Sequence, residues 1–496
     1  MGNLIVDLKS IASWTRGYLT ENRKGVMCLV FGVLVGLGYA FSSLPIILYG
    51  VLLLFLLVMG LRDHRNFYYI VVLFIFWEHA RLEIHQKPFL AYFYVANVFS
   101  VLVFVIHMMN RLAGGGLKRQ ATPLDLVLFG LLWYYGITLT WCTSEFLVES
   151  FIVYFFLNYC MFYISGVIVN DSKVFIRSVF AWIVGGVICA IGIVASEYIE
   201  LEKTWVLAKN IKIYLAMVQT VERPSGFAYC NTVAAAVVPP ILMLLGVLQY
   251  VRTKKAKFFL LTLIFFLFYA LILTESRGGV IGLVGGFFFF FLFNPRYRGK
   301  QIRTLICVFL FSGMTLLITD PSFIDRILVG FGYSGELLVP KEGNNTFSGG
   351  QSTRGLTGIG IRLYWWKSAF EKVKEKPYRL LFGYGQTSYL QQIKYLEHSI
   401  LMGFFFDAGV IGILLMMLIF VIVMSNVFQI VRHPREQKEY YLFLGVISGV
   451  IAILGIHGLI NFDLIALPVW FIFGYCMAVI NVVKRALYGR DAVAVV

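Results

Sequence analysis

Two long apolar runs flank a short polar turn in residues 257–294, KFFLLTLIFFLFYALILTESRGGVIGLVGGFFFFFLFN. An α-helix needs about 20 apolar residues to cross the hydrocarbon part of a bilayer, and each run approaches that length. The turn between them, Thr274 to Gly279, is so short that its arginine, Arg277, must lie almost in the membrane. The stretch therefore predicts a hairpin of two membrane-spanning helices with a charged residue at its tip.

The rest of the chain has the same apolar character. Of its 496 residues, 59% are hydrophobic and 14% are charged, and the mean hydropathy is +0.82. A soluble domain keeps much of its surface in water and cannot bury so much apolar side chain, so a soluble protein and a disordered chain are both excluded. We expect an all-α, polytopic transmembrane bundle of about 14 spans (12–14), with one large periplasmic loop that contains amphipathic helices.

Basic residues indicate the orientation of these spans. The chain has 42 Lys and Arg against 26 Asp and Glu, a net charge of +16. With the N-terminus in the cytoplasm, the basic clusters between spans fall on the cytoplasmic side, as the positive-inside rule requires. The charge is thus explained by topology, and we expect no nucleic-acid partner.

The predicted organisation has five parts. They are a cytoplasmic amphipathic segment (1–25), transmembrane helices 1–11 (26–319) with external loops 79–90 and 198–231, a large periplasmic loop (320–396), transmembrane helices 12–14 (397–485) and a cytoplasmic tail (486–496). In the large loop, Leu363, Trp366, Phe370 and Val373 recur at helical spacing with lysines opposite, which predicts an amphipathic helix over the bundle. We expect no metal and no cofactor, since the seven cysteines form no CxxC pair and His79 and His85 are six residues apart.

Three external clusters carry cations against the positive-inside trend. They contain Arg223, Gly226 and Asn231; Ser276, Arg277 and Gly278; and Arg354, Arg362, Glu397, His398 and Ser399. Arginine binds phosphate oxygens through two parallel hydrogen bonds and stays charged, so converging arginines suit a diphosphate. A neutral imidazole at His398 could accept the proton of a sugar hydroxyl. Together these residues fit substitution at an anomeric carbon with a diphosphate leaving group.

Structural interpretations of the same residues stay open. Arg277 could contact lipid phosphates from the membrane boundary, and Arg223 could pair with Glu222 at the surface. His398 could be a helix cap, and His457 could be a boundary polar group. A polyprenyl-linked glycan transporter would also hold buried cations, although the middles of most spans here are uncharged.

The order of these motifs resembles the O-antigen ligase/polymerase superfamily of bacterial envelope glycosyltransferases. The resemblance covers roughly residues 220–415. The matching residues are Arg223-Pro224-Ser225-Gly226-Phe227 through Asn231 to Ala234-Ala235-Ala236, Thr274-Glu275-Ser276-Arg277-Gly278, Arg362, Trp366, Pro377, Gly383-Tyr384-Gly385, His398 and Asp407-Ala408-Gly409-Val410-Ile411-Gly412. One position departs from the pattern: Ser399 stands where the family has asparagine, so the role of that amide is in doubt.

The resemblance implies a metal-independent, inverting transfer of a glycan from undecaprenyl diphosphate, at the periplasmic face of the bacterial inner membrane. It assigns the arginines to the diphosphate, His398 to the role of base, and the other residues of the three clusters to support. The acceptor is a lipid-linked glycan for a polymerase, and a lipid A core sugar or a protein for a ligase. Membrane lipids and a chain-length regulator or flippase are the other expected partners. Family ligases have about twelve spans, so the larger expected count favours a polymerase.

The topology generates a first testable prediction, for single cysteines placed at Ser348 and at Lys438. A membrane-impermeant thiol reagent added from outside should label Ser348→Cys and not Lys438→Cys, because the first lies in the predicted periplasmic loop and the second in a basic cytoplasmic loop. Labelling after permeabilisation is the control for reactivity at both positions. The reverse pattern, or equal labelling from outside, would refute the topology.

Overall fold

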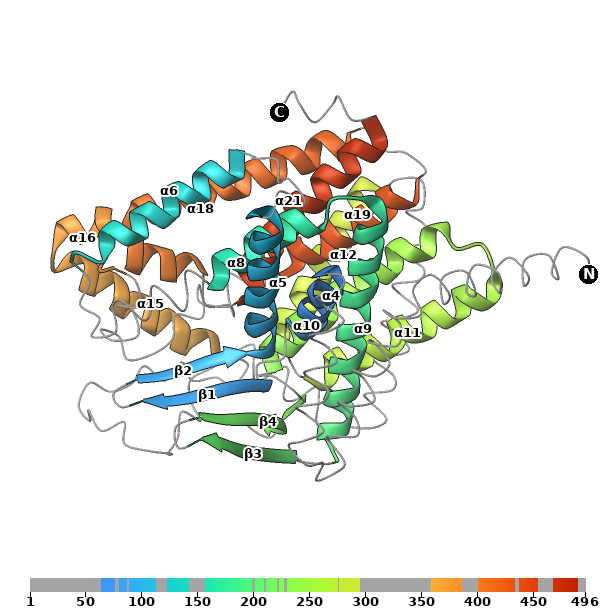
Figure 1. The fold of residues 1–496 in the computed structure, drawn as a ribbon, viewed down its shortest axis with the longest axis horizontal. Coiled ribbons are helices and arrows are strands. Elements are labelled where there is room, and N and C mark those ends of the chain that lie inside the picture. The colour runs from blue at the N-terminus through green and yellow to red at the C-terminus, as the bar shows by residue number, and fades with distance from the viewer. Residues whose placement is uncertain are drawn as a thin grey trace, which may run out of the picture.

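The structure, a computed structural model, describes residues 64–75, 80–86, 89–112, 123–141, 157–198, 201–208, 211–220, 223–226, 230–274, 276–294, 358–385, 400–432, 437–453 and 467–488 (Figure 1). The predicted segment 1–25, the first two predicted spans, the predicted span at 304–319 and residues Arg354, Glu397, His398 and Ser399 lie outside the described residues. What the sequence predicts for them stays a prediction.

Helices make up most of the described chain. They are α4 (His64–Phe74), α5 (Val95–Leu112), α6 (Pro123–Thr138), α8 (Leu157–Ile168), α9 (Ser172–Ser196), α10 (Cys230–Tyr250), α11 (Lys254–Leu273), α12 (Arg277–Phe293), α15 (Gly358–Lys374), α16 (Pro377–Phe382), α18 (Ile400–Val431), α19 (Lys438–Ile451) and α21 (Leu467–Tyr488). Five of the described helices, α9, α10, α11, α18 and α21, contain segments long and apolar enough to cross a membrane. The predicted helical membrane bundle is confirmed at this level, and the count of about 14 spans stays a prediction.

A small antiparallel sheet amends the all-α prediction. Its strands are β1 (Ala80–Gln86), β2 (Phe89–Tyr94), β3 (Leu201–Ala208), β4 (Ile211–Thr220) and β5 (Arg223–Gly226). The order is β2-β1-β4-β3, and β5 pairs with the end of β4 (Figure 1). Strands β1, β3, β4 and β5 occupy the segments predicted as external loops 79–90 and 198–231. Strand β2 takes the first residues of the span predicted from residue 90, and the helix there begins at Val95. The two segments pair through β1 and β4, with Arg81 opposite Tyr214, so each satisfies backbone groups of the other.

Helix α10 lies at the centre of the helical packing. It contacts α9, α11, α12 and α19, and it is buried along most of its length. Three of these neighbours approach it through glycines. A Cβ atom would lie 2.4 Å from Pro240 Cγ at Gly186 of α9, 2.5 Å from Leu242 Cδ1 at Gly286 of α12, and 2.7 Å from the Leu242 carbonyl oxygen at Gly445 of α19. The missing side chains let the helices pack closely enough for van der Waals attraction, which is the main force between helices in lipid.

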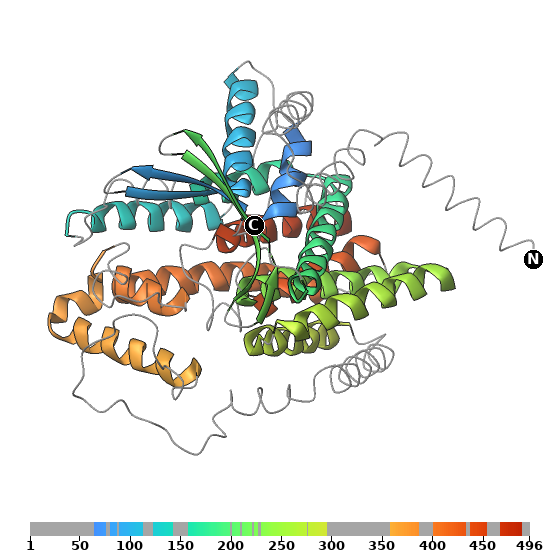
Figure 2. The same cartoon turned by 90° about the horizontal axis from the view of Figure 1, so that it is seen from below.

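Helix α18 is interrupted at Gly409. This residue has non-helical angles (φ 65°, ψ −161°), so the helix consists of two parts on either side of it. The part from Val410 to Val431 alone spans about 33 Å at 1.5 Å per residue, which suffices to cross the hydrocarbon region. Helices α15 and α16 lie next to α18 at one end of the molecule (Figures 1 and 2). A helix is present where the amphipathic helix of the large loop is predicted, as α15; Val373 of its predicted apolar face is buried, whereas Phe370 of the same face is exposed, and the periplasmic placement stays a prediction.

Candidate functional site

The first cluster lies where the sheet meets the bundle. Strand β5 pairs with β4, with Arg223 opposite Thr220, and it packs against α9 and α10. Helix α10 begins at Cys230, so Asn231 is its second residue. Strand β5, with Arg223 and Gly226, therefore lies shortly before the N-terminal end of the central helix in the chain and contacts that helix, and Asn231 lies in its first turn.

The second cluster forms the tight connection between α11 and α12. Helix α11 ends at Leu273, and α12 begins at Arg277. Ser276 is the N-cap of α12, because its Oγ accepts a hydrogen bond from the Gly279 amide at 3.2 Å. Thr274 Oγ1 accepts a hydrogen bond from the Ser276 amide at 3.3 Å and donates one to the Leu271 carbonyl oxygen at 2.6 Å. The two buried hydroxyls thus fix the backbone that carries Arg277.

The structure brings these two clusters to the same end of the bundle. A Cβ atom at Gly279 would lie 2.8 Å from Ala234 Cβ, so the first turn of α12 rests on the first turns of α10. The N-terminal ends of both helices are therefore neighbours, with Asn231 near one and Arg277 at the other. Helix N-termini carry unpaired amide groups and a partial positive charge, which favour an anion in the same way as the arginines do.

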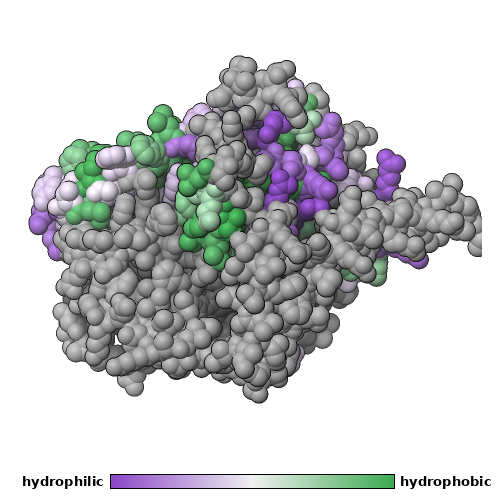
Figure 3. Space-filling model, viewed as in Figure 1, coloured by the Kyte–Doolittle hydropathy of each residue, from purple (hydrophilic) through white to green (hydrophobic). Residues whose placement is uncertain are grey.

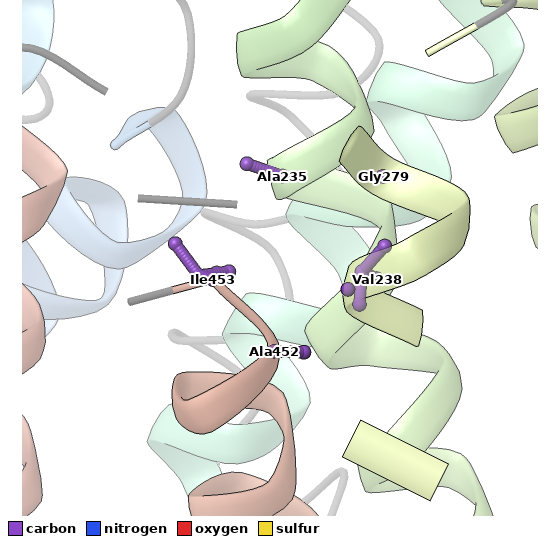
Figure 4. A pocket seen from close by; sticks show the side chains of 6 residues that line it. Ala235, Val238, Gly279, Ala452 and Ile453 are labelled. Atoms are coloured by element: carbon purple, nitrogen blue, oxygen red, sulfur yellow. The ribbon is translucent and has the colours of Figure 1, made fainter. Parts of the chain in front are cut away.

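An apolar crevice lies next to the neighbouring N-terminal ends of α10 and α12. It is lined by Ala235 and Val238 of α10, Gly279 and Gly282 of α12, and Ala452 and Ile453 after α19 (Figure 4). Among the described residues, no charged or polar side chain lines it, so this part of the crevice does not suit a diphosphate.

The third cluster is tested least by the structure. Arg362 lies on α15, whose main neighbours among the described elements are α16 and α18. The other members of this cluster lie outside the described residues. Whether Arg362 joins Arg223 and Arg277 in one site stays a prediction.

The segment Gly383 to Gly385 binds the start of the segment Asp407 to Gly412. The amides of Tyr384 and Gly385 donate hydrogen bonds of 2.8 Å to the carbonyl oxygens of Phe406 and Asp407. Gly383 has φ +70°, and a Cβ atom there would lie 2.4 Å from the Asp407 carbonyl oxygen. The segment Gly383 to Gly385 therefore docks on α18 where Gly409 interrupts it. These glycines allow a close backbone contact.

Two side chains that the sequence analysis did not single out hold this docking in place. Tyr134 of α6 donates from its hydroxyl to the carbonyl oxygens of Ala408 (2.9 Å) and Phe382 (3.1 Å). Arg379 of α16 is 8% exposed, and its guanidinium donates to the carbonyl oxygens of Gly383 (3.0 Å) and Trp141 (3.4 Å). Neither residue belongs to a motif, and only the tertiary contacts identify their role. Together they tie the large loop to α6 and α18, and we call these contacts the loop anchor.

Residues 261–417 match a family model described as O-antigen ligase (Wzy_C). The match includes the Ser276–Arg277 turn, α15, α16 and the first part of α18. It confirms the resemblance to the O-antigen ligase/polymerase superfamily, whose members are membrane glycosyltransferases. The Arg223 cluster lies before the matched residues. A search of curated proteins found no match.

The loop anchor generates a second prediction, for the substitution Gly409→Ala. A Cβ atom at this residue would lie 2.3 Å from the Leu381 carbonyl oxygen, in a backbone conformation that L-residues rarely adopt. We expect a loss of about 1–3 kcal/mol of stability, measured as a lower midpoint of thermal unfolding in detergent. Gly130→Ala is the matched control, because among the described residues no atom of a neighbouring segment lies within 4 Å of its Cβ position in α6. Equal midpoints for the two variants would contradict the observed docking of α16 on α18.

Proposed function

Residues 261–417 carry the O-antigen ligase match, and on this premise we propose that the protein is a metal-independent, inverting glycosyltransferase. It moves a glycan from undecaprenyl diphosphate to an acceptor sugar hydroxyl at the periplasmic face of the bacterial inner membrane. The acceptor is most simply the next lipid-linked repeat unit, which makes the enzyme a polymerase of an envelope polysaccharide.

One observation supports this proposal above the others. Helices α10 and α12 begin side by side, because Gly279 of α12 lies against Ala234 of α10; α12 begins at Arg277, and strand β5, which carries Arg223, ends shortly before α10 begins. Two arginines and two helix ends supply positive charge without a metal, and a diphosphate is the substrate group that such a site suits. Arg354 and Arg362 are proposed to complete it from the large loop.

The proposed reaction is a single displacement. His398 takes the proton of the acceptor hydroxyl, and the oxygen attacks the anomeric carbon of the donor from the face opposite the diphosphate. The new glycosidic bond forms as the bond between the anomeric carbon and the diphosphate oxygen breaks, and the configuration inverts. The arginines stabilise the charge on the departing diphosphate, so no general acid is needed. Glu397 and Ser399 flank the base and are proposed to orient it.

A ligase is the second candidate, with a lipid A core sugar or a protein as acceptor, since the family match is described as O-antigen ligase. The remote alternative is a polyprenyl-linked glycan transporter. Gene deletion separates the first two: single repeat units on lipid carrier accumulate without a polymerase, and unattached full-length polymer accumulates without a ligase. A chain-length regulator or a flippase is the expected protein partner of either enzyme.

The third prediction concerns Arg277, proposed to bind the diphosphate through two hydrogen bonds. Arg277→Ala should abolish transfer while folded protein stays in the membrane, and Arg277→Lys should recover little, because lysine cannot make the two-pronged contact. The assay is glycan transfer by purified protein in detergent or vesicles. Arg252→Ala, at the opposite end of α10 and α11, is the control and should keep most activity. If the Arg277→Lys variant keeps most activity, the residue supplies only general positive potential, and contact with lipid phosphate becomes the better explanation.

The fourth prediction concerns His398 as the base. His398→Ala should slow the chemical step by about 10²–10⁴-fold while the donor still binds, because the arginines hold the diphosphate independently. The rate of the unmodified enzyme should fall at acidic pH as the imidazole becomes protonated, and chelators should have no effect. Donor binding and turnover are measured separately with a defined polyprenyl-diphosphate donor.

His85→Ala is the matched histidine control for this experiment, because β1 carries His85 outside the three clusters. Near-normal turnover by His398→Ala would show that His398 caps a helix. Loss of donor binding together with turnover would place it in the diphosphate site. A requirement for a divalent cation would refute the metal-independent mechanism.

A further inference from the structure

Helix α16 presents large apolar side chains outward. Of its six residues, Tyr378, Leu380, Leu381 and Phe382 are 55%, 42%, 46% and 39% exposed, whereas Arg379 is buried against the loop anchor. Phe370 of α15 is 42% exposed. Figure 3 shows hydrophobic side chains over α16 and the neighbouring α6, with polar ones at the adjoining end of the molecule. A water-exposed loop would not be expected to gather so many apolar side chains on one short helix.

The contacts of α16 with α18 and α6 indicate its depth relative to the membrane. It docks on α18 at Gly409, beyond which Val410 to Val431 is just long enough to cross the hydrocarbon region. It also contacts the end of α6 through the hydrogen bond from Tyr134 to the Phe382 carbonyl oxygen. Helix α16 therefore lies beside the start of the Val410 to Val431 segment and beside the last turns of α6, a shorter apolar helix.

The exposed face of α6 leads directly to α16. Leu126, Phe129, Trp133 and Ile137 are 73%, 54%, 61% and 49% exposed and recur every three or four residues, which makes one stripe along the helix. Such a stripe on a membrane helix faces lipid. The stripe ends beside Tyr134, where α16 begins to cover α6 and α18. The apolar side chains of α16 thus continue the exposed apolar surface of α6.

Basic side chains border this apolar face. Lys367 and Lys376 are exposed, and Lys374 lies 4.7 Å above the Phe370 ring while it pairs with Glu371 at 3.1 Å. Lysines beside exposed leucine and aromatic side chains are typical of segments that lie in the interface between headgroups and acyl chains, where the cations meet anionic phospholipid.

We propose that α16, together with Phe370 of α15, is an interfacial anchor that inserts its apolar side chains into one leaflet of a membrane containing anionic phospholipid. On the predicted topology this is the periplasmic leaflet. The anchor fixes the large loop at the membrane surface, because the Gly383 to Gly385 segment binds α18, and Arg379 of α16 binds that segment and the Trp141 carbonyl oxygen. The proposal does not rest on the proposed reaction, and its test needs no activity measurement.

The test uses a fluorophore on single introduced cysteines at Leu380 or Leu381, in vesicles of phosphatidylethanolamine and phosphatidylglycerol. Quenching is measured with iodide in water and with phospholipids that carry a nitroxide at a shallow or a deep acyl position. Signal from the parent protein is subtracted. Phe129→Cys in the middle of α6 and Glu371→Cys on the exposed face of α15 are the controls for deep lipid and for water.

We expect labels at Leu380 and Leu381 to be quenched most by the shallow nitroxide, and iodide to quench them several-fold less than the label at Glu371. Lys376→Glu should reduce this shallow quenching, and so should replacement of phosphatidylglycerol by phosphatidylcholine. Iodide quenching equal to that at Glu371 would place α16 in water and overturn the proposal. Protection from both iodide and nitroxide lipids would show that protein covers α16, which overturns it equally. Indifference to lipid charge would refute the anionic part.

Discussion

The close packing of α10 is the constraint on which the rest of the structure depends. In lipid, apolar side chains gain nothing by leaving the solvent, so helices associate through close van der Waals contact. Helices α9, α12 and α19 each approach α10 with a glycine, at Gly186, Gly286 and Gly445, and their backbones come near enough to pack. The buried central helix and its lipid-exposed neighbours follow from these contacts.

The candidate site is a consequence of the same packing. Gly279 lets the first turn of α12 lie on Ala234, and this contact aligns the N-terminal ends of α10 and α12. The cap at Ser276 then sets where α12 begins and hence where Arg277 lies. Strand β5 adds Arg223 beside α10. The side-by-side start of α10 and α12 thus arises from helix packing and helix capping together.

A second set of contacts holds the large loop against α6 and α18. Arg379 and Tyr134 bind backbone carbonyl oxygens, and the Gly383 to Gly385 segment pairs with Phe406 and Asp407. All these contacts involve main-chain atoms, which explains why glycines recur on both sides. The interruption of α18 at Gly409 exposes the carbonyl groups that the loop segment binds, so the break in the helix and the docking of the loop are one feature.

The sequence by itself determined the helical membrane segments, the tight 274–279 connection and the residue types suited to a diphosphate, because apolar length and local charge are properties of consecutive residues. Only the tertiary structure decided that segments 79–90 and 198–231 pair as a sheet, that α10 and α12 begin side by side, and that Arg379 anchors the loop. Each of these depends on residues distant in the chain. Which of these distant segments contact each other depends on which backbones can approach closely. A pattern of neighbouring residues in the sequence does not specify that approach.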